Sequence, residues 1–228
     1  MKNRVLLLGL LLLAGCATNP AVIKPDKSKG EPFSTNVYLS GQTITATPPP
    51  VALPIVTGEF TDERDGQVYK WVKIGTQTWM AQNLNYKTAA HSWTYNTDDH
   101  NNLYGRLYSF DVLLQACPKG WHVPTDTEWM QLEKYLGLKY DEAGLLGSRG
   151  DIADKLLPDN NNDFNILYGG WYNNNNFTEI GISAHFWTST GYGQPIAIRV
   201  FKKGKQGIYR NTINREAGLS LRCVKDYW

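Results

Sequence analysis

The first sixteen residues constrain the chain most, because they decide the compartment in which it folds. Lys2 and Arg4 precede an apolar run from Val5 to Leu13, and two small residues follow that run. A basic start, a short apolar segment and small residues before a cleavage point are typical of a secretory signal peptide. The run is shorter than the about 20 apolar residues that a membrane-spanning helix needs. We therefore expect an exported protein that loses residues 1–15.

The end of this leader also predicts a membrane anchor. Leu13-Ala14-Gly15-Cys16 resembles the bacterial lipobox, in which the cysteine becomes the lipidated first residue of the mature protein. Cys16 is then an anchor rather than a thiol, and its acyl chains hold the protein by about 0.8 kcal/mol per buried CH₂. The alternative is an ordinary secretory signal with a chance cysteine. Ala17 is not an acidic retention residue, which favours the outer membrane, on its periplasmic face or at the cell surface.

The two other cysteines, Cys117 and Cys223, form an even pair in an exported chain. Such a pair predicts a disulfide bond, because exported proteins fold under oxidising conditions. Two buried free thiols are the alternative. A metal site is a weaker one, since no nearby His or Cys supplies further ligands.

Residues 16–57 read as a tether, and residues 58–228 as a single domain. The tether is rich in proline, with threonine and serine between the prolines, a composition that favours an extended or disordered chain. Its prolines are Pro20, Pro25, Pro32, Pro48, Pro49, Pro50 and Pro54. The formal net charge of +2 argues against a nucleic-acid partner, which would require a clearly basic chain.

The clearest local signals in the domain are a hairpin and a helix. Val68–Ile74 and Gln77–Met80 flank a glycine-containing turn, which predicts two antiparallel strands. Thr125-Asp126-Thr127-Glu128 matches a capping box, and Gly137 is a suitable stop. The helix between them should bury one apolar face. Its members are Trp129, Leu132, Tyr135 and Leu136.

Further helices are expected over Tyr108–Gln115 and Asp151–Leu157. The last third of the chain reads as strands separated by Gly, Pro and Asn. These strands are Ala184–Ser189, Ile196–Phe201, Gly207–Ile213 and Leu219–Val224. The apolar alternation at Ile196–Val200 predicts a half-buried antiparallel strand. A hairpin, then helices, then a strand meander indicate the α+β class, with two or three helices.

A series of motifs runs through the domain in a fixed order. The motifs are Asp65–Tyr69, Ile74–Leu84, Tyr104–Tyr108, Cys117–Thr125, Glu128-Trp129, Phe186–Thr190 and Leu221–Val224. Over about residues 59–226, this series resembles a known family, the Fibrobacter succinogenes major paralogous domain. More distantly, the family is similar to the C-type lectin-like fold of sulfatase-modifying factors, at the Pro-Thr-x-x-Glu-Trp helix start and the final Arg-Cys strand. The resemblance implies a C-type lectin-like domain in a surface setting rather than a particular reaction.

One segment combines aromatic planes with amides, as sugar-binding surfaces do. Its residues are Trp171, Tyr172, Asn173, Asn174, Asn175, Asn176 and Phe177. A sugar ring could stack on the aromatics while the amides meet its hydroxyls, and a protein partner would suit the same surface. The alternative is a flexible polar loop with a packed Trp. Weaker candidates for the same binding surface are Trp93, Tyr95 and Tyr192. The tryptophans inside the family motifs, Trp79, Trp121, Trp129 and Trp187, are expected in the core.

No residue pattern predicts catalysis or a cofactor. His122 and His185 sit between apolar residues and read as packed, hydrogen-bonded side chains. Asp126 and Glu128 are explained by helix capping, so no carboxylate pair is left for glycoside hydrolysis. Two polar segments carry oxygen ligands as a calcium loop does, Asp159–Asp163 and Asp98–Asn102. Neither has the EF-hand pattern, so we expect both to be solvated turns. Bound calcium is the alternative.

The sequence thus favours a lipid-anchored envelope protein with a non-catalytic recognition domain for a polysaccharide or a surface protein. The alternative is a structural or assembly subunit of an outer-membrane complex. An enzyme ranks third.

Overall fold

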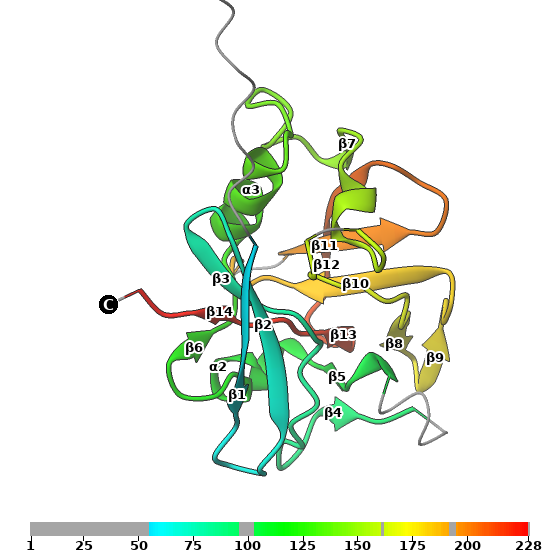
Figure 1. Ribbon diagram of the computed structural model, residues 1–228. Coiled ribbons are helices and arrows are strands. Elements are labelled where there is room, and N and C mark those ends of the chain that lie inside the picture. Colours follow the sequence, from blue (N-terminus) through cyan, green and yellow to red (C-terminus); the bar gives the residue numbers. More distant parts are fainter. Residues whose placement is uncertain (1–54, 96–102, 161, 192–194, 228) are drawn as a thin grey trace, which may run out of the picture. The chain divides into compact units, whose positions relative to one another are not determined.

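β-Strands dominate the computed structural model, which describes residues 55–95, 103–160, 162–191 and 195–227 (Figure 1). Five strands form a sheet with the order β1-β2-β3-β14-β6. They are β1 (Val56–Thr61), β2 (Val68–Ile74), β3 (Gln77–Met80), β14 (Val224–Lys225) and β6 (Trp121–His122). The predictions for Cys16, for nearly all of the tether, for Tyr192 and for Asp98–Asn102 lie outside the described residues.

A second sheet has seven strands in the order β4-β5-β13-β10-β11-β12-β7. They are β4 (Ser92–Trp93), β5 (Leu107–Tyr108), β13 (Leu219–Ser220), β10 (Ser183–Trp187), β11 (Ile196–Lys202), β12 (Ile208–Ile213) and β7 (Gly147–Arg149). The pairing of β10 with β13 is parallel, and the other pairings in this sheet are antiparallel. A separate hairpin consists of β8 (Trp171–Asn173) and β9 (Asn176–Thr178).

Helices are too few and too short for the expected α+β, C-type lectin-like fold, and that prediction is wrong. The described residues contain α3 (Asp126–Tyr135) and the single turn α2 (Leu113–Ala116). Two 3₁₀ turns, η1 (Phe110–Val112) and η2 (Ala153–Leu156), stand where longer helices were expected. The chain is extended at Ser109 and Cys117 on either side of η1 and α2, and at Leu157 before Pro158. A residue before proline avoids the helical region, which ends these turns early.

Helix α3 has the predicted capping box at its start and the predicted glycine after its end. The Thr125 hydroxyl accepts the Glu128 N–H at 3.1 Å, and the Glu128 carboxylate accepts the Thr125 N–H at 2.7 Å. Gly137 follows the helix with a φ of 110°, a conformation that favours glycine. Tyr135 departs from the prediction, because it is 59% exposed rather than part of the buried face. Among the described residues, no helix has the length and apolar character to cross a membrane.

The predicted strands of the β2–β3 hairpin are confirmed, whereas the predicted half-burial of β11 is wrong. Strands β2 and β3 have the predicted bounds. Strand β11 is buried from Ile196 to Phe201 rather than half-buried, and Arg199 is fully inaccessible. Its guanidinium reaches α3, where it lies 2.6 Å from Asp126 and 2.5 Å from Glu133. Arg199, whose charge indicated a solvent-exposed face of β11, therefore forms ion pairs with α3.

The predicted last strand is two strands, one in each sheet. Ser220 in β13 pairs with β10, and Val224 in β14 pairs with β3 and β6. Between them, the carbonyl oxygens of Leu221 and Cys223 accept the N–H groups of Leu84 and Met80, at 2.8 and 3.0 Å. The segment from Leu221 to Cys223 therefore joins the two sheets.

Residue Cys223 in this crossing segment is bonded to Cys117, which confirms the predicted disulfide. The core consists of two clusters of buried side chains. Trp79 and Trp129 belong to the first cluster, and Trp187 and Trp121 belong to the second, so the four motif tryptophans lie in the core as expected.

Candidate ligand-binding site

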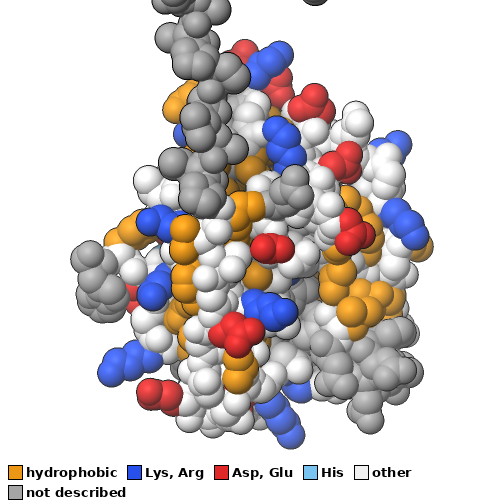
Figure 2. Space-filling view, in the orientation of Figure 1, with side chains coloured by type: hydrophobic (Ala, Val, Ile, Leu, Met, Phe, Trp, Pro, Cys, Tyr) orange, Lys and Arg blue, Asp and Glu red, His pale blue; other side chains and the backbone are white. Residues whose placement is uncertain are grey.

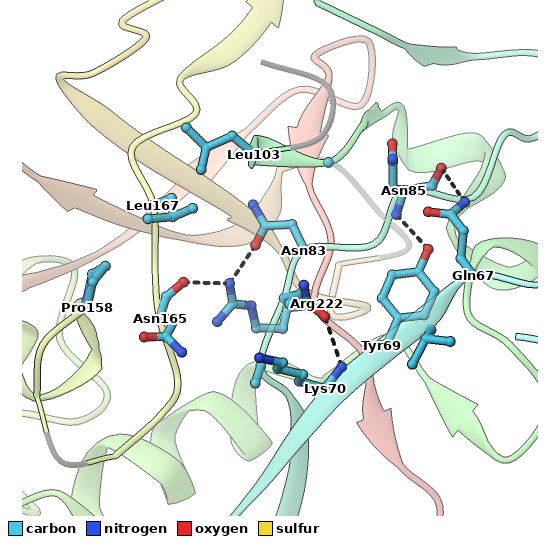
Figure 3. A pocket seen from close by; sticks show the side chains of 14 residues that line it. Gln67, Tyr69, Lys70, Asn83, Asn85, Leu103, Pro158, Asn165, Leu167 and Arg222 are labelled. Atoms are coloured by element: carbon cyan, nitrogen blue, oxygen red, sulfur yellow. Dashed lines mark hydrogen bonds between the residues drawn. The ribbon is translucent and has the colours of Figure 1, made fainter. Parts of the chain in front are cut away.

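A polar pocket of about 390 Å³ opens beside the crossing segment of the chain (Figure 3). Its described lining combines two cations and several amides with a few apolar side chains and includes no carboxylate. The residues are Gln67, Val68, Tyr69, Lys70, Ala81, Gln82, Asn83, Asn85, Leu103, Gly105, Pro158, Asn165, Leu167 and Arg222. They come from β2, from the segment after β3, from two loops and from the crossing segment, so only the tertiary fold brings them together.

Arg222 is the buried cation of this pocket, and it is 1% exposed. Its Nη2 donates to the Asn83 side-chain oxygen at 2.7 Å and to the Asn165 carbonyl at 3.1 Å (Figure 3). Its Nη1 donates to the Phe164 carbonyl. The guanidinium also lies over the rings of Phe164 and Phe186, 4.7 and 5.6 Å from their centroids. Arg222 thus connects the crossing segment to two loops through neutral acceptors and aromatic faces.

The charge of Arg222 has no carboxylate partner among the described residues. Burial lowers the pKa of this guanidinium to about 9, and no acidic group acts against that shift. The Nε–H is buried and makes no hydrogen bond to the described protein atoms. Charged groups are almost never fully buried without an ionic partner. Arg222 is therefore an uncompensated positive charge at the wall of a polar pocket.

Hydrogen bonds hold the wall formed by β2 and the following segment. The Asn85 N–H donates to the Tyr69 hydroxyl at 3.0 Å, and the Lys70 N–H donates to the Gln82 side-chain oxygen at 2.9 Å (Figure 3). Burial raises the pKa of Tyr69 well above its usual range, so the phenol stays neutral. The wall therefore presents fixed amides and a neutral hydroxyl.

Asn165 contributes to the opposite side of the pocket from an unusual backbone conformation. Its φ of 55° lies in the left-handed region, which Asn tolerates better than most residues. Its side chain donates to the Asp163 carbonyl at 3.0 Å, while its own carbonyl accepts from Arg222. The side chain of Asn165 thus holds its own loop, and the backbone carbonyl holds Arg222.

The predicted binding segment, Trp171–Phe177, forms the β8–β9 hairpin rather than an irregular loop. Asn174 and Asn175 occupy its turn with φ values of 47° and 62°, as hairpin turns require. Tyr172 exchanges backbone hydrogen bonds with Gly218, so the hairpin is attached to the chain just before β13. Its residues do not line the Arg222 pocket.

The aromatic rings of this hairpin face other rings of the protein. Tyr172 stacks on Trp93 with centroids 4.4 Å apart, and Phe177 stacks on Tyr95 at 5.0 Å. Trp171 stacks on His185 at 5.4 Å, and its buried indole N–H has no described partner. Each of these stacking contacts covers one face of the ring, which leaves less aromatic surface for a sugar. The proposed role of Trp171, Tyr172, Asn173, Asn174, Asn175, Asn176 and Phe177 in binding stays a prediction.

His122 lies between two carboxylates. Its Nε2 is 2.7 Å from Glu128, and its Nδ1 is 2.7 Å from Asp226 near the end of the chain. The hydrogen bond to Glu128, followed by that to Asp226, raises the pKa of His122 against the opposing effect of burial. The predicted hydrogen bonding of His122 is confirmed, although its side chain is 34% exposed rather than buried.

This arrangement predicts a pH-dependent contribution to stability. Because its pKa is raised by folding, protonated His122 stabilises the fold below its ordinary pKa of about 6.5, and that contribution is lost as the pH rises through the folded value. We expect an NMR titration of its ring protons to give a midpoint above about 6.5 and a lower midpoint in the Asp226→Asn variant. A midpoint at or below about 6.5 in the unmodified protein would contradict the assignment.

His185 is buried and does not form a catalytic relay. Its Nε2 contacts both the Ser183 hydroxyl, at 2.9 Å, and the Glu179 carboxylate, at 3.2 Å. A serine relay needs the acid and the nucleophile on different ring nitrogens. Here Ser183 is inaccessible and donates to Glu179 at 2.5 Å, and burial lowers the pKa of His185. The cluster is a hydrogen-bonded support beneath Trp171.

The described residues contain no group of three or more His, Cys, Asp or Glu side chains that could hold a metal ion. In the Asp159–Asp163 segment, the side chain of Asn160 donates to the Asp154 carbonyl, and that of Asn162 donates to the Lys155 carbonyl at 2.8 Å. Those two amides support the turn after η2.

Comparison with known proteins gives one match. A family model described as the Fibrobacter succinogenes major domain matches residues 72–225. The searches of curated proteins and of solved structures found no match. The match includes the pocket residues from Ala81 to Arg222 but not those from Gln67 to Lys70, and its description names no ligand.

Proposed function

The chain belongs to the Fibrobacter succinogenes major domain family, and we propose that it is a lipid-anchored cell-envelope protein that recognises a polysaccharide without cleaving it. The Arg222 pocket, rather than the β8–β9 hairpin, is the proposed binding site. The leader and Cys16 support the anchor, and Ala17 supports the outer membrane as its location.

The observation that carries this proposal is the lining of the pocket. Five amide side chains surround a volume of about 390 Å³, which is within the usual range for small-ligand sites. Amides both donate and accept hydrogen bonds, so they suit the hydroxyl groups of sugars. Among the described residues, the lining of this pocket contains no His, Ser, Cys, Asp or Glu, the side chains that most often supply bases and nucleophiles, and the carboxylates of Glu59 and Asp163 line only the adjoining hollow. Recognition therefore fits this site better than hydrolysis.

The assembly alternative has less support from the described surface. Figure 2 shows apolar side chains interspersed with charged ones on one face of the domain. Exposed large apolar side chains lie on several elements, with Leu114 on α2 and Ile182 before β10, and a further group lies at and after the end of α3. That group consists of Tyr135, Tyr140, Leu145 and Leu146. A subunit interface would favour one broad apolar patch.

A pair of Asn→Gly variants tests the proposed site against the hairpin. Asn165→Gly removes an amide from the pocket but keeps a residue that tolerates positive φ, and Asn175→Gly makes the same change in the hairpin turn. The full-length protein and both variants would be applied to an array of plant and bacterial polysaccharides, with an assay for released sugars. We expect saturable binding without release, weakened about 5-fold or more by Asn165→Gly and unchanged by Asn175→Gly.

The opposite pattern, with binding lost only in Asn175→Gly, would assign the site to the hairpin. Released sugar would contradict the non-catalytic role. Binding to no polysaccharide by a folded protein would reject carbohydrate recognition and favour a protein partner.

A further inference from the structure

The proposed pocket does not end at Asn165 but adjoins a second hollow. This hollow has a volume of about 350 Å³ and shares Lys70, Ala81 and Asn165 with the first. Its other residues are Thr57, Gly58, Glu59, Trp71 and Asp163. Lys70 and Arg222 both line the first pocket (Figure 3). The two hollows are therefore adjacent, with Lys70 among the residues at their junction.

The two ends of this region differ in charge. The Arg222 end carries the cation of Arg222, with Lys70 at the junction, and its described lining includes no carboxylate. The other end carries the carboxylates of Glu59 and Asp163 beside an indole. The ring of Trp71 lies against Gly58, where it leaves no room for a Cβ. One end therefore attracts an anion, and the other offers an aromatic surface with hydrogen-bond acceptors.

Resting on the proposed function, we propose that the ligand is an oligosaccharide in which an acidic sugar is joined to a neutral one. The carboxylate of the acidic sugar lies at the Arg222 end and supplies the negative charge that this buried guanidinium lacks. The neutral sugar lies against Trp71, and its hydroxyls donate to Glu59 and Asp163. An apolar ring face on an indole and hydroxyls on carboxylates match the chemistry of each end.

The test compares two disaccharides that differ in one group. Cellobiouronic acid, glucuronic acid joined to glucose, carries a carboxylate where cellobiose carries a CH₂OH group. Titration calorimetry on the full-length protein would measure both. We expect cellobiouronic acid to bind at least 10-fold more tightly at low salt, and the difference to shrink as added salt screens the charges.

A matched pair of lysine variants locates the effect. Arg222 holds two loops together, so its replacement risks unfolding the domain. Lys70→Gln removes the accessible cation at the junction, and Lys73→Gln removes an exposed lysine of the same strand that lines neither hollow. We expect Lys70→Gln to lose about 3- to 10-fold in affinity for the acidic disaccharide only, and Lys73→Gln to lose nothing. Trp71→Leu should weaken both disaccharides by a similar factor.

Each other outcome has a definite meaning. Equal affinity for the two disaccharides, or equal effects of the two lysine variants, would overturn the acidic-sugar assignment and leave polysaccharide recognition intact. Tight binding of a peptide through its terminal carboxylate, without binding of either disaccharide, would also overturn it and would name a protein ligand. Failure on the polysaccharide array as well would reject the proposed function itself.

Discussion

Removing the disulfide by the double substitution Cys117→Ala and Cys223→Ala is expected to lower the free energy of unfolding by roughly 2–5 kcal/mol. The bond joins residues separated by 106 positions, so it closes a long loop in the unfolded chain. Loop closure alone accounts for about 4.7 kcal/mol at about 100 residues in the chain-entropy model. Urea denaturation of the oxidised protein and of the variant measures the difference.

Reduction of the unmodified protein provides the control for this experiment. A thiol reductant should lower its stability toward that of the double variant, and it should leave the variant unchanged. A variant as stable as the oxidised protein, with the same dependence on urea, would show that the bond adds nothing to the fold.

Glu133→Gln should be about as damaging, with an expected loss of roughly 3–5 kcal/mol. Glu133 is inaccessible on α3 and lies 2.5 Å from Arg199 and 3.0 Å from Arg149. Asp126 on the same helix lies 2.6 Å from Arg199 and 2.7 Å from Arg210. Two carboxylates thus face three guanidinium groups, and losing one carboxylate leaves buried positive charge without compensation.

The exposed ion pair between Asp111 and Arg215 gives a matched control. Its atoms are 2.6 Å apart, but the side chains are 49% and 45% exposed. Asp111→Asn makes the same carboxylate-to-amide change there, and it should cost at most about 1 kcal/mol because solvent screens the pair. Chemical denaturation of both variants compares them. Similar losses in the two variants would show that burial does not amplify the pairing of Glu133.

The sequence predicted the parts of the fold that are decided by neighbouring residues. The β2–β3 hairpin and α3 have glycine turns or a capping box within a few positions, and both were located correctly. Strands of two residues, such as β13 and β14, are too short to show a periodic pattern. The α+β class failed for a related reason, since apolar spacing at residues 108–115 does not reveal that the chain is extended at both ends of that segment.

The candidate site was missed because its residues are far apart in the sequence. Arg222 and Asn83 lie inside family motifs that do not mark them as binding residues, and no local pattern marks Asn165. An arginine between Leu221 and Cys223 in an apolar strand was the available signal, since a buried arginine needs nearby acceptors. The positions of those acceptors, the Asn83 side chain and the carbonyls of residues 164 and 165, depend on loop conformations that no local pattern predicts.

The position of Leu219–Lys225 between two sheets also sets the order in which the domain can form. Strand β13 fills the place between β5 and β10, and β14 fills the place between β3 and β6. A nascent chain that lacks these residues leaves two gaps, with unpaired strand edges that invite aggregation. Neither sheet can be completed during synthesis of the preceding residues. Both sheets therefore stay incomplete until Leu219–Lys225 has been added and has paired with the earlier strands.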